Sequence, residues 1–142
     1  MQIFVFTCQL ICLAVLFGRA PYGEIGVYGW ALFSLGGSLA GWAFVVMNLQ
    51  SRFHFLPRSR QGSSLLRTGP YRWWRHPMYA GVGFMGGVVA LARWDGWAIG
   101  ATIGYVVVIE WKMRIEEAEL SKKFPDYSGY MQKAARWIPK VY

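Results

Sequence analysis

The amino-acid sequence predicts an all-α integral membrane protein with about four transmembrane helices and a cytoplasmic, amphipathic helical tail at its C-terminus. Of its 142 residues, 55% are hydrophobic and 18% are aromatic, but only 15% are charged, whereas soluble domains contain about 25% charged residues. The apolar residues gather in four runs, and the basic residues lie between these runs. Aromatic belts at the ends of membrane spans explain the abundance of Trp, Tyr and Phe. The length suits one domain over residues 1–142.

The first two apolar runs, residues 3–18 and 25–49, are the first two predicted spans. The second contains no charged residue and is long enough to cross about 30 Å of hydrocarbon with some tilt. It is rich in small residues between positions 36 and 41, which favour close helix packing. Within this stretch, Gly37 and Gly41 have the four-residue spacing of a GxxxG motif, which is typical of tight helix pairs in membranes.

The other two predicted spans, residues 78–92 and 98–114, form a hairpin joined by the short turn RWDGW. Pro77 favours a helix start just before the third span, because proline at the first helical position loses no hydrogen bond. The fourth helix should continue without a break into the charged stretch KMRIEEAELSKKF. Pro125 should then end it, because proline cannot continue a helix without losing a backbone hydrogen bond.

The distribution of positive charge predicts the orientation of these spans. Six Lys or Arg residues lie between Gln50 and Pro77, and seven follow Trp111, which leaves only Arg19 and Arg93 for the opposite side. Short cytoplasmic segments carry such an excess of positive charge. We therefore expect both termini and the segment before Pro77 to be cytoplasmic. The many Trp residues and short loops favour the inner membrane of a prokaryote.

Most of the chemistry in this poorly charged chain is concentrated in RTGPYRWWRHPMYAG, residues 67–81. Arg75 and His76 come just before the predicted start of the third helix. Free N–H groups and the positive end of the dipole make a helix start suitable for an anionic group. In a purely structural interpretation, Arg72, Arg75 and the two neighbouring tryptophans only anchor the helix in the head-group layer.

A second charged constellation is EWKMRIEEAEL, residues 110–120. Glu110, Arg114 and Glu117 are spaced four and three residues apart, so they share one helix face. Glu110 ends an apolar run, and an ionisable group at the hydrocarbon edge should face a partner or a polar cavity. The pair of Glu110 with Arg114 could also be purely structural. Both constellations lie at the cytoplasmic ends of neighbouring spans and could line one pocket for a polar cofactor.

Several other kinds of site are excluded by the sequence. It contains no Walker loop, no HExxH, no GxSxG and no GxGxxG after a strand. Cys8 and Cys12 are interpreted as small buried hydrophobic residues, and no metal-ligand spacing is present. His54 stands alone between two phenylalanines and is interpreted as an interfacial residue. No metal site is therefore predicted, and no nucleic-acid partner either, because the basic residues form no single polar face.

Two blocks of the sequence resemble a known family. LLRTGPYRWWRHPMYAG, residues 65–81, resembles the Gly-x-Tyr-x-x-x-Arg-His-Pro-x-Tyr-x-Gly signature of the isoprenylcysteine carboxyl methyltransferase family and its phospholipid-methyltransferase relatives. RIEEAELSKKFPDYSGYMQKAARWIP, residues 114–139, is similar to the second block of that family, an Arg-x-Glu-Glu helix followed by spaced aromatic residues and a closing proline. The chain departs from the family in FPDY, residues 124–127, where Phe-Gly-x-x-Tyr is common.

The resemblance implies an integral membrane methyltransferase that uses S-adenosylmethionine (SAM). It transfers a methyl group by direct displacement to a lipophilic acceptor, which could be a carboxylate, an amine or a thiol on a lipid or small molecule. The cofactor motifs would occupy residues 67–81 and 110–139. Carried onto this chain, the resemblance implies three groups of site residues: cofactor-binding His76, Pro77, Tyr79, Gly81, Glu116 and Glu117; catalytic Arg75 and Arg114; and substrate-binding Arg136.

Two alternatives stay open. Membrane sterol reductases, which bind NADPH, carry a related Arg-His-Pro-x-Tyr block, but they usually have Asn and an acidic residue where this chain has Met78 and Val82. The double glutamate favours the methyltransferase. The other alternative is a lipid-binding membrane subunit without enzymatic activity, whose arginines meet anionic head groups. The methyl acceptor and the oligomeric state are not determined by the sequence.

Overall fold

The computed structural model describes residues 2–18, 20, 22–51 and 65–137, which form helices and no strand. The all-α class is therefore confirmed for this part of the chain. The helices are α1 (Gln2–Gly18), α2 (Val27–Ser51), the 3₁₀ helix η1 (Gly69–Arg72), α3 (Pro77–Arg93), α4 (Gly96–Lys123) and α5 (Tyr127–Met131). Residues 52–64, which include His54, and residues 138–142, with the closing proline of the second block, lie outside the described part.

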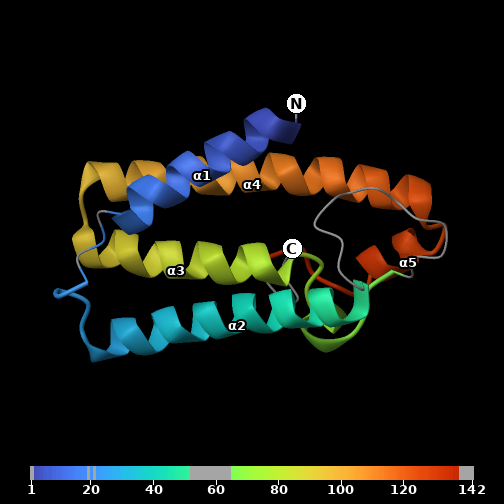
Figure 1. Cartoon of the computed structure of the whole chain (residues 1–142), viewed down its shortest axis with the longest axis horizontal. Coiled ribbons are helices and arrows are strands. Elements are labelled where there is room, and N and C mark those ends of the chain that lie inside the picture. Colours follow the sequence, from blue (N-terminus) through green and yellow to red (C-terminus); the bar gives the residue numbers. More distant parts are fainter. Residues whose placement is uncertain (1, 19, 21, 52–64, 138–142) are drawn as a thin grey trace.

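The four long helices form a bundle in which α3 lies between α2 and α4, and α1 crosses α4 (Figure 1). The C-terminal ends of α2 and α4, the start of α3 and α5 all gather at one end of this bundle. Both sequence blocks therefore lie at the same end. This arrangement agrees with the predicted hairpin of the third and fourth apolar runs.

The four predicted spans correspond to four helices, but only one helix within the described residues has the length and hydropathy of a membrane span. This is Val27–Leu49 of α2, with a mean hydropathy of 1.6 over its most apolar window. The apolar stretch of α1, Thr7–Gly18, is shorter. Helix α3 has only 17 residues, and charged residues fill the last turns of α4. The count of four spans stays a prediction.

Helices α2 and α3 approach so closely that their backbones touch. A Cβ atom on Gly81 would lie 2.5 Å from the carbonyl oxygen of Gly36 and 2.8 Å from the amide nitrogen of Ala40. The predicted close packing of small residues is thus confirmed at Gly36 and Ala40. The expected GxxxG pair, Gly37 and Gly41, is not the closest contact, because a Cβ on Gly41 would meet nothing within 4 Å. The contact face lies one residue earlier, a rotation of about 100° around the helix.

The helix ends follow the local signals in the sequence. Helix α3 begins at Pro77, with His76 as its N-cap, and it ends at Arg93, followed by the C-cap Trp94, whose φ of 46° is left-handed. Asp95 caps α4 by accepting a hydrogen bond from the backbone N–H of Ala98 at 2.7 Å. Helix α4 ends at Lys123, two residues before Pro125. The turn at RWDGW, the long fourth helix and its end are therefore confirmed.

The predicted helical tail is correct only for the five residues of α5. After α5 the chain leaves the helix and lies beside the segment that precedes α3, where Trp74 and Ala135 form an isolated parallel bridge. The N–H of Ala135 donates to the carbonyl of Trp73 at 2.9 Å, and the N–H of Arg75 donates to the carbonyl of Ala135 at 2.7 Å. These non-local hydrogen bonds replace those that a continued helix would have made.

Candidate functional site

The two sequence blocks meet at Glu117, a carboxylate of α4 that is only 5% exposed. Its Oε1 lies 3.0 Å from Nε of Arg75 and 3.2 Å from Nε2 of His76. Arg136 approaches from the C-terminal segment and binds both oxygens, with Nη2 at 2.5 Å from Oε2 and Nε at 3.2 Å from Oε1. Three basic side chains from two distant segments therefore surround one buried carboxylate.

These neighbours determine the ionisation of Glu117, which lies beyond the fourth predicted span. Burial opposes the charged form, but hydrogen bonds from His76 and Arg136, together with the charges of Arg75 and Arg136, outweigh it and lower the pKa to about 2. Glu117 is therefore ionised throughout the neutral range. Its charge compensates the arginines, which otherwise would be buried without a counter-charge.

A second carboxylate, Glu110, extends the cluster along α4. Nη1 of Arg136 lies 2.7 Å from its Oε1, and Nε of Arg114 lies 2.8 Å from the same oxygen. Glu110 and Glu117 are seven residues apart, two helical turns, so Arg136 can bridge them. The predicted pair of Glu110 with Arg114 is confirmed. Arg114 is the outer member, because its side chain is 65% exposed.

Glu116 is in a different situation, although it is the neighbour of Glu117. Its Oε1 accepts one hydrogen bond, from the hydroxyl of Tyr79 at 2.9 Å. Its Oε2 lies 3.6 Å from Nδ1 of His76, too far for a hydrogen bond. The rings of His76 and Tyr79 stack with their centroids 5.7 Å apart, and the side chain of Glu116 is 35% exposed. Glu116 therefore keeps capacity to accept hydrogen bonds from a ligand.

Arg75 is fixed by the backbone of the C-terminal segment. One of its terminal nitrogens donates to the carbonyl of Met131 at 3.0 Å. Its buried Nε is close to Glu117 but has no aligned hydrogen-bond acceptor within the described residues. Tyr130 stabilises the 3₁₀ helix η1, which precedes Arg75, because its hydroxyl donates to the carbonyl of Tyr71 at 2.6 Å. Burial, with a smaller contribution from Tyr71, raises the pKa of Tyr130 to about 12, so the hydroxyl keeps its proton.

The structure thus sorts the predicted site residues into three groups, one of which is Arg114 alone, the exposed partner of Glu110 at the edge of the cluster. It brings together at one place Arg75, His76, Tyr79, Glu116, Glu117 and Arg136. Pro77 begins α3, and Gly81 faces the backbone of α2, so helix geometry and packing account for both residues. Their contact with a cofactor stays a prediction. Glu110 was not among the predicted site residues. Its position at the end of an apolar run was the feature of the sequence that could have indicated a role in this cluster.

Glu117 also predicts a pH dependence of stability. A carboxyl whose pKa falls from 4.5 to about 2 on folding stabilises the folded state fully above pH 4.5 and loses this contribution as the pH falls to 2. The contribution is about 3 kcal/mol, from 1.36 kcal/mol per pKa unit. We expect the difference in unfolding free energy between the wild type and Glu117→Gln to be constant above about pH 5 and to vanish near pH 2. Denaturant titrations in detergent at each pH measure it, and a difference independent of pH would contradict the assignment.

Comparison with known proteins agrees with this geometry. A model of the phospholipid methyltransferase family matches residues 24–127, which contain α2, α3, α4 and the cluster except for Arg136. An uncharacterised protein of Schizosaccharomyces pombe is 29% identical over 86 residues, which cover 56% of this chain but 25% of that protein. The chain therefore spans only about a quarter of that relative. No solved structure matches. Because the family match covers well over half of the sequence, this chain belongs to the phospholipid methyltransferase family.

Proposed function

We propose that this protein transfers a methyl group from SAM to a lipophilic acceptor at the end of the bundle where its two sequence blocks meet. Membership of the phospholipid methyltransferase family supports methyl transfer. The observation that carries the proposal is the convergence on Glu117 of Arg75 and His76 from the first block and Arg136 from the tail. Burying this much charge is costly, and perturbed ionisable groups of this kind are concentrated at functional sites.

The donors and acceptors of the cluster fit the chemistry of SAM. The cofactor carries a carboxylate, an ammonium and ribose hydroxyl groups, so it needs both basic and acidic partners. Glu116 has acceptor capacity for the ammonium or the hydroxyls. Arg75 lies in the same cluster, paired with Glu117, and arginine suits a carboxylate group. The sequence resemblance implied two glutamates in contact with the cofactor; the partners of Glu117 favour a positioning role for it and leave Glu116 as the ligand.

The proposed reaction requires mainly orientation from the protein. Bound SAM supplies a methyl group that is already activated by its sulfonium centre. The protein residues hold the two reactants in line and exclude water, which is enough to accelerate a displacement strongly. Tyr79 orients Glu116 through its hydrogen bond, and Glu117 holds Arg75 and Arg136. A carboxylate or thiolate acceptor needs no base, whereas an amine must lose a proton, for which His76 and Glu116 are the candidates.

The acceptor is proposed to arrive from the membrane. Helix α2 is apolar and long enough to cross a bilayer, and only 11% of its most apolar window is buried within the protein. Its last turns reach the same end of the bundle as the cluster. The positive-inside rule favours the cytoplasmic side for this end. A lipophilic acceptor held in the bilayer could therefore meet a water-soluble cofactor there.

Binding of SAM and of its demethylated product tests the proposal directly. We expect the purified protein in detergent to bind both with micromolar affinity in a calorimetric titration. Glu116→Gln should weaken binding at least about tenfold, because a hydrogen bond to a charged group contributes about 1.5–3 kcal/mol. Glu119→Gln is the matched control, because it removes the same charge from an exposed position on α4 and should bind like the wild type.

Two results would argue against this function. A well-folded wild type that binds neither SAM nor its product would remove the methyltransferase proposal. Binding of NADPH in the same experiment would favour the alternative of a sterol-reductase-like protein. A normal far-ultraviolet circular dichroism spectrum establishes for each variant that the helices are intact.

A further inference from the structure

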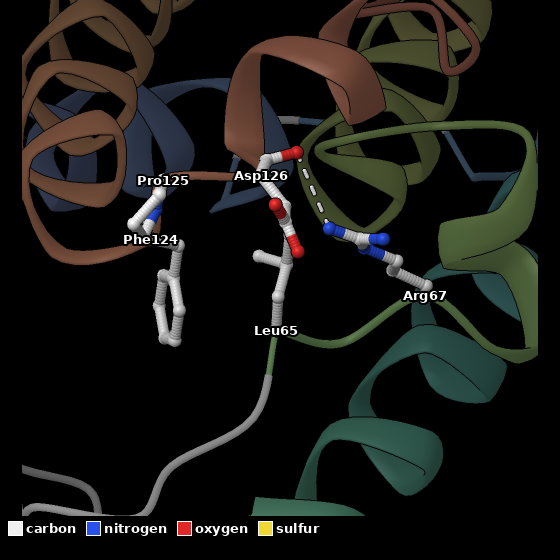
Figure 2. A pocket seen from close by; sticks show the side chains of 5 residues that line it. All are labelled: Leu65, Arg67, Phe124, Pro125 and Asp126. Carbon is white, nitrogen blue, oxygen red and sulfur yellow. Dashed lines mark hydrogen bonds between the residues drawn. The ribbon is translucent and has the colours of Figure 1, made fainter.

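Two neighbouring cavities lie at the same end of the bundle, and none of their lining residues belongs to the cluster around Glu117. The smaller cavity, drawn in Figure 2, has a volume of about 300 Å³ and is lined by Leu65, Arg67, Phe124, Pro125 and Asp126. The larger, here called the basic cavity, has a volume of about 520 Å³ and is lined by Arg67, Arg72, Pro125, Asp126, Ser128, Gly129, Tyr130 and Lys133. Arg67, Pro125 and Asp126 line both, so the two cavities share a wall.

The basic cavity has a strong excess of positive charge. Three cations line it, Arg67, Arg72 and Lys133, against one carboxylate, Asp126. Arg67 donates to the backbone carbonyl of Asp126 at 3.3 Å (Figure 2) and not to its carboxylate. Within the described residues, the side chains of Arg72 and Lys133 have no hydrogen bond or ion pair, and both residues are exposed. Their charges are therefore available to an anion that enters the cavity.

The smaller cavity adds an apolar surface next to this charge. Leu65 and Phe124 line it, as do Arg67 and Asp126, whose hydrogen bond is drawn in Figure 2. Exposed tryptophans lie nearby: Trp73 directly follows Arg72 and packs near Trp42, with ring centroids 6.3 Å apart. Exposed tryptophans gather at the level of lipid head groups. The two cavities therefore combine cations with an apolar wall at the depth where amphipathic anions reside.

We propose that the basic cavity binds the phosphate group of an amphipathic anion, whose apolar part occupies the smaller cavity beside Leu65 and Phe124. Arg67 and Arg72 offer planar, forked donors that match phosphate oxygens, and Lys133 adds a third charge. The hydroxyl of Ser128 can donate as well. The ligand is bound as an anion and is not the group that is methylated, so the site does not depend on the proposed methyl transfer. Binding of this ligand would hold the cytoplasmic end of the bundle at an anionic membrane surface.

Titration of the purified protein with short-chain lipids tests this site. Native mass spectrometry gives the binding of dihexanoyl phosphatidylglycerol, dihexanoyl phosphatidylcholine, glycerol phosphate and inorganic phosphate. We expect phosphatidylglycerol to bind at least tenfold more tightly than phosphatidylcholine, whose choline compensates the phosphate charge. The double variant Arg72→Gln/Lys133→Gln should lose at least fivefold in affinity for phosphatidylglycerol. Lys122→Gln, which removes an exposed charge that lines neither cavity, should lose less than twofold.

The outcomes separate the possible sources of the phosphate. Tighter binding of phosphatidylglycerol than of glycerol phosphate supports a membrane lipid as the ligand, because only the lipid fills the smaller cavity. Equal binding of the two supports a soluble phosphate ester and overturns the role of Leu65 and Phe124. Equal losses in the Arg72→Gln/Lys133→Gln variant and in Lys122→Gln would overturn the site, because they would show attraction by net charge alone. A SAM titration of the same variants is expected to be unchanged.

Discussion

Replacing Glu117 by glutamine is expected to destabilise the protein by about 3–5 kcal/mol and to abolish SAM binding at micromolar cofactor concentrations. The substitution keeps the size of the side chain but removes the negative charge that Arg75, His76 and Arg136 share. Removing one partner of a buried ion pair costs about 3–5 kcal/mol, because the other charge stays buried without compensation. Equilibrium unfolding in detergent micelles measures the first effect, and calorimetry with SAM measures the second.

Glu119→Gln, on the exposed side of the same helix, is the control, and its unfolding free energy should stay within about 0.5 kcal/mol of the wild type. A double-mutant cycle sharpens the test. If Glu117 serves mainly to hold Arg136, the variant Glu117→Gln/Arg136→Gln should lose clearly less than the sum of the two single losses. Additive losses, or a Glu117→Gln protein as stable as the wild type, would contradict the central role of this carboxylate.

The sequence predicted where this site lies but not which residue has which role. Two charged blocks at adjoining ends of a helical hairpin must come close, so a shared pocket followed from the order of the elements. The division of roles between Glu116 and Glu117 did not follow, because it depends on which basic side chains reach each carboxylate. Arg136 reaches Glu117 through the backbone bridge of Trp74 with Ala135. This bridge joins segments 61 residues apart, and no local periodicity of the sequence indicates it.

The fold was predictable to a similar extent. Pro77, Asp95 and Pro125 act within one turn of the chain, and the helix ends near them agree with the structure. The face by which α2 meets α3 was not predictable, because small residues between positions 36 and 41 occupy more than a full turn of α2. Only the partner helix selects Gly36 and Ala40 from this group. A membrane span needs both length and hydropathy, and within the described residues only α2 meets both criteria.

The close contact of α2 and α3 leads to the second prediction with a large effect, the loss of stability in Gly81→Ala. The added methyl group would lie 2.5 Å from the carbonyl oxygen of Gly36 and 3.0 Å from Cβ of Ala40. Backbone atoms cannot move aside as a flexible side chain can, so the helices must separate. Overpacking of this kind typically costs about 1–3 kcal/mol. We expect a loss of this size in the free energy of unfolding, measured by denaturant titration in detergent.

Gly87→Ala in the same helix is the matched control, because its added methyl group meets nothing within 4 Å. Replacing a helical glycine by alanine without a clash favours the helix by up to about 1 kcal/mol, so the two substitutions should have opposite signs. The pair also separates packing from cofactor binding. A stable Gly81→Ala protein that no longer binds SAM would indicate that Gly81 borders the cofactor, as the family resemblance implies. A destabilised protein whose folded fraction binds SAM normally would indicate that this glycine serves the helix contact alone, because the contact with α2 by itself excludes any larger residue.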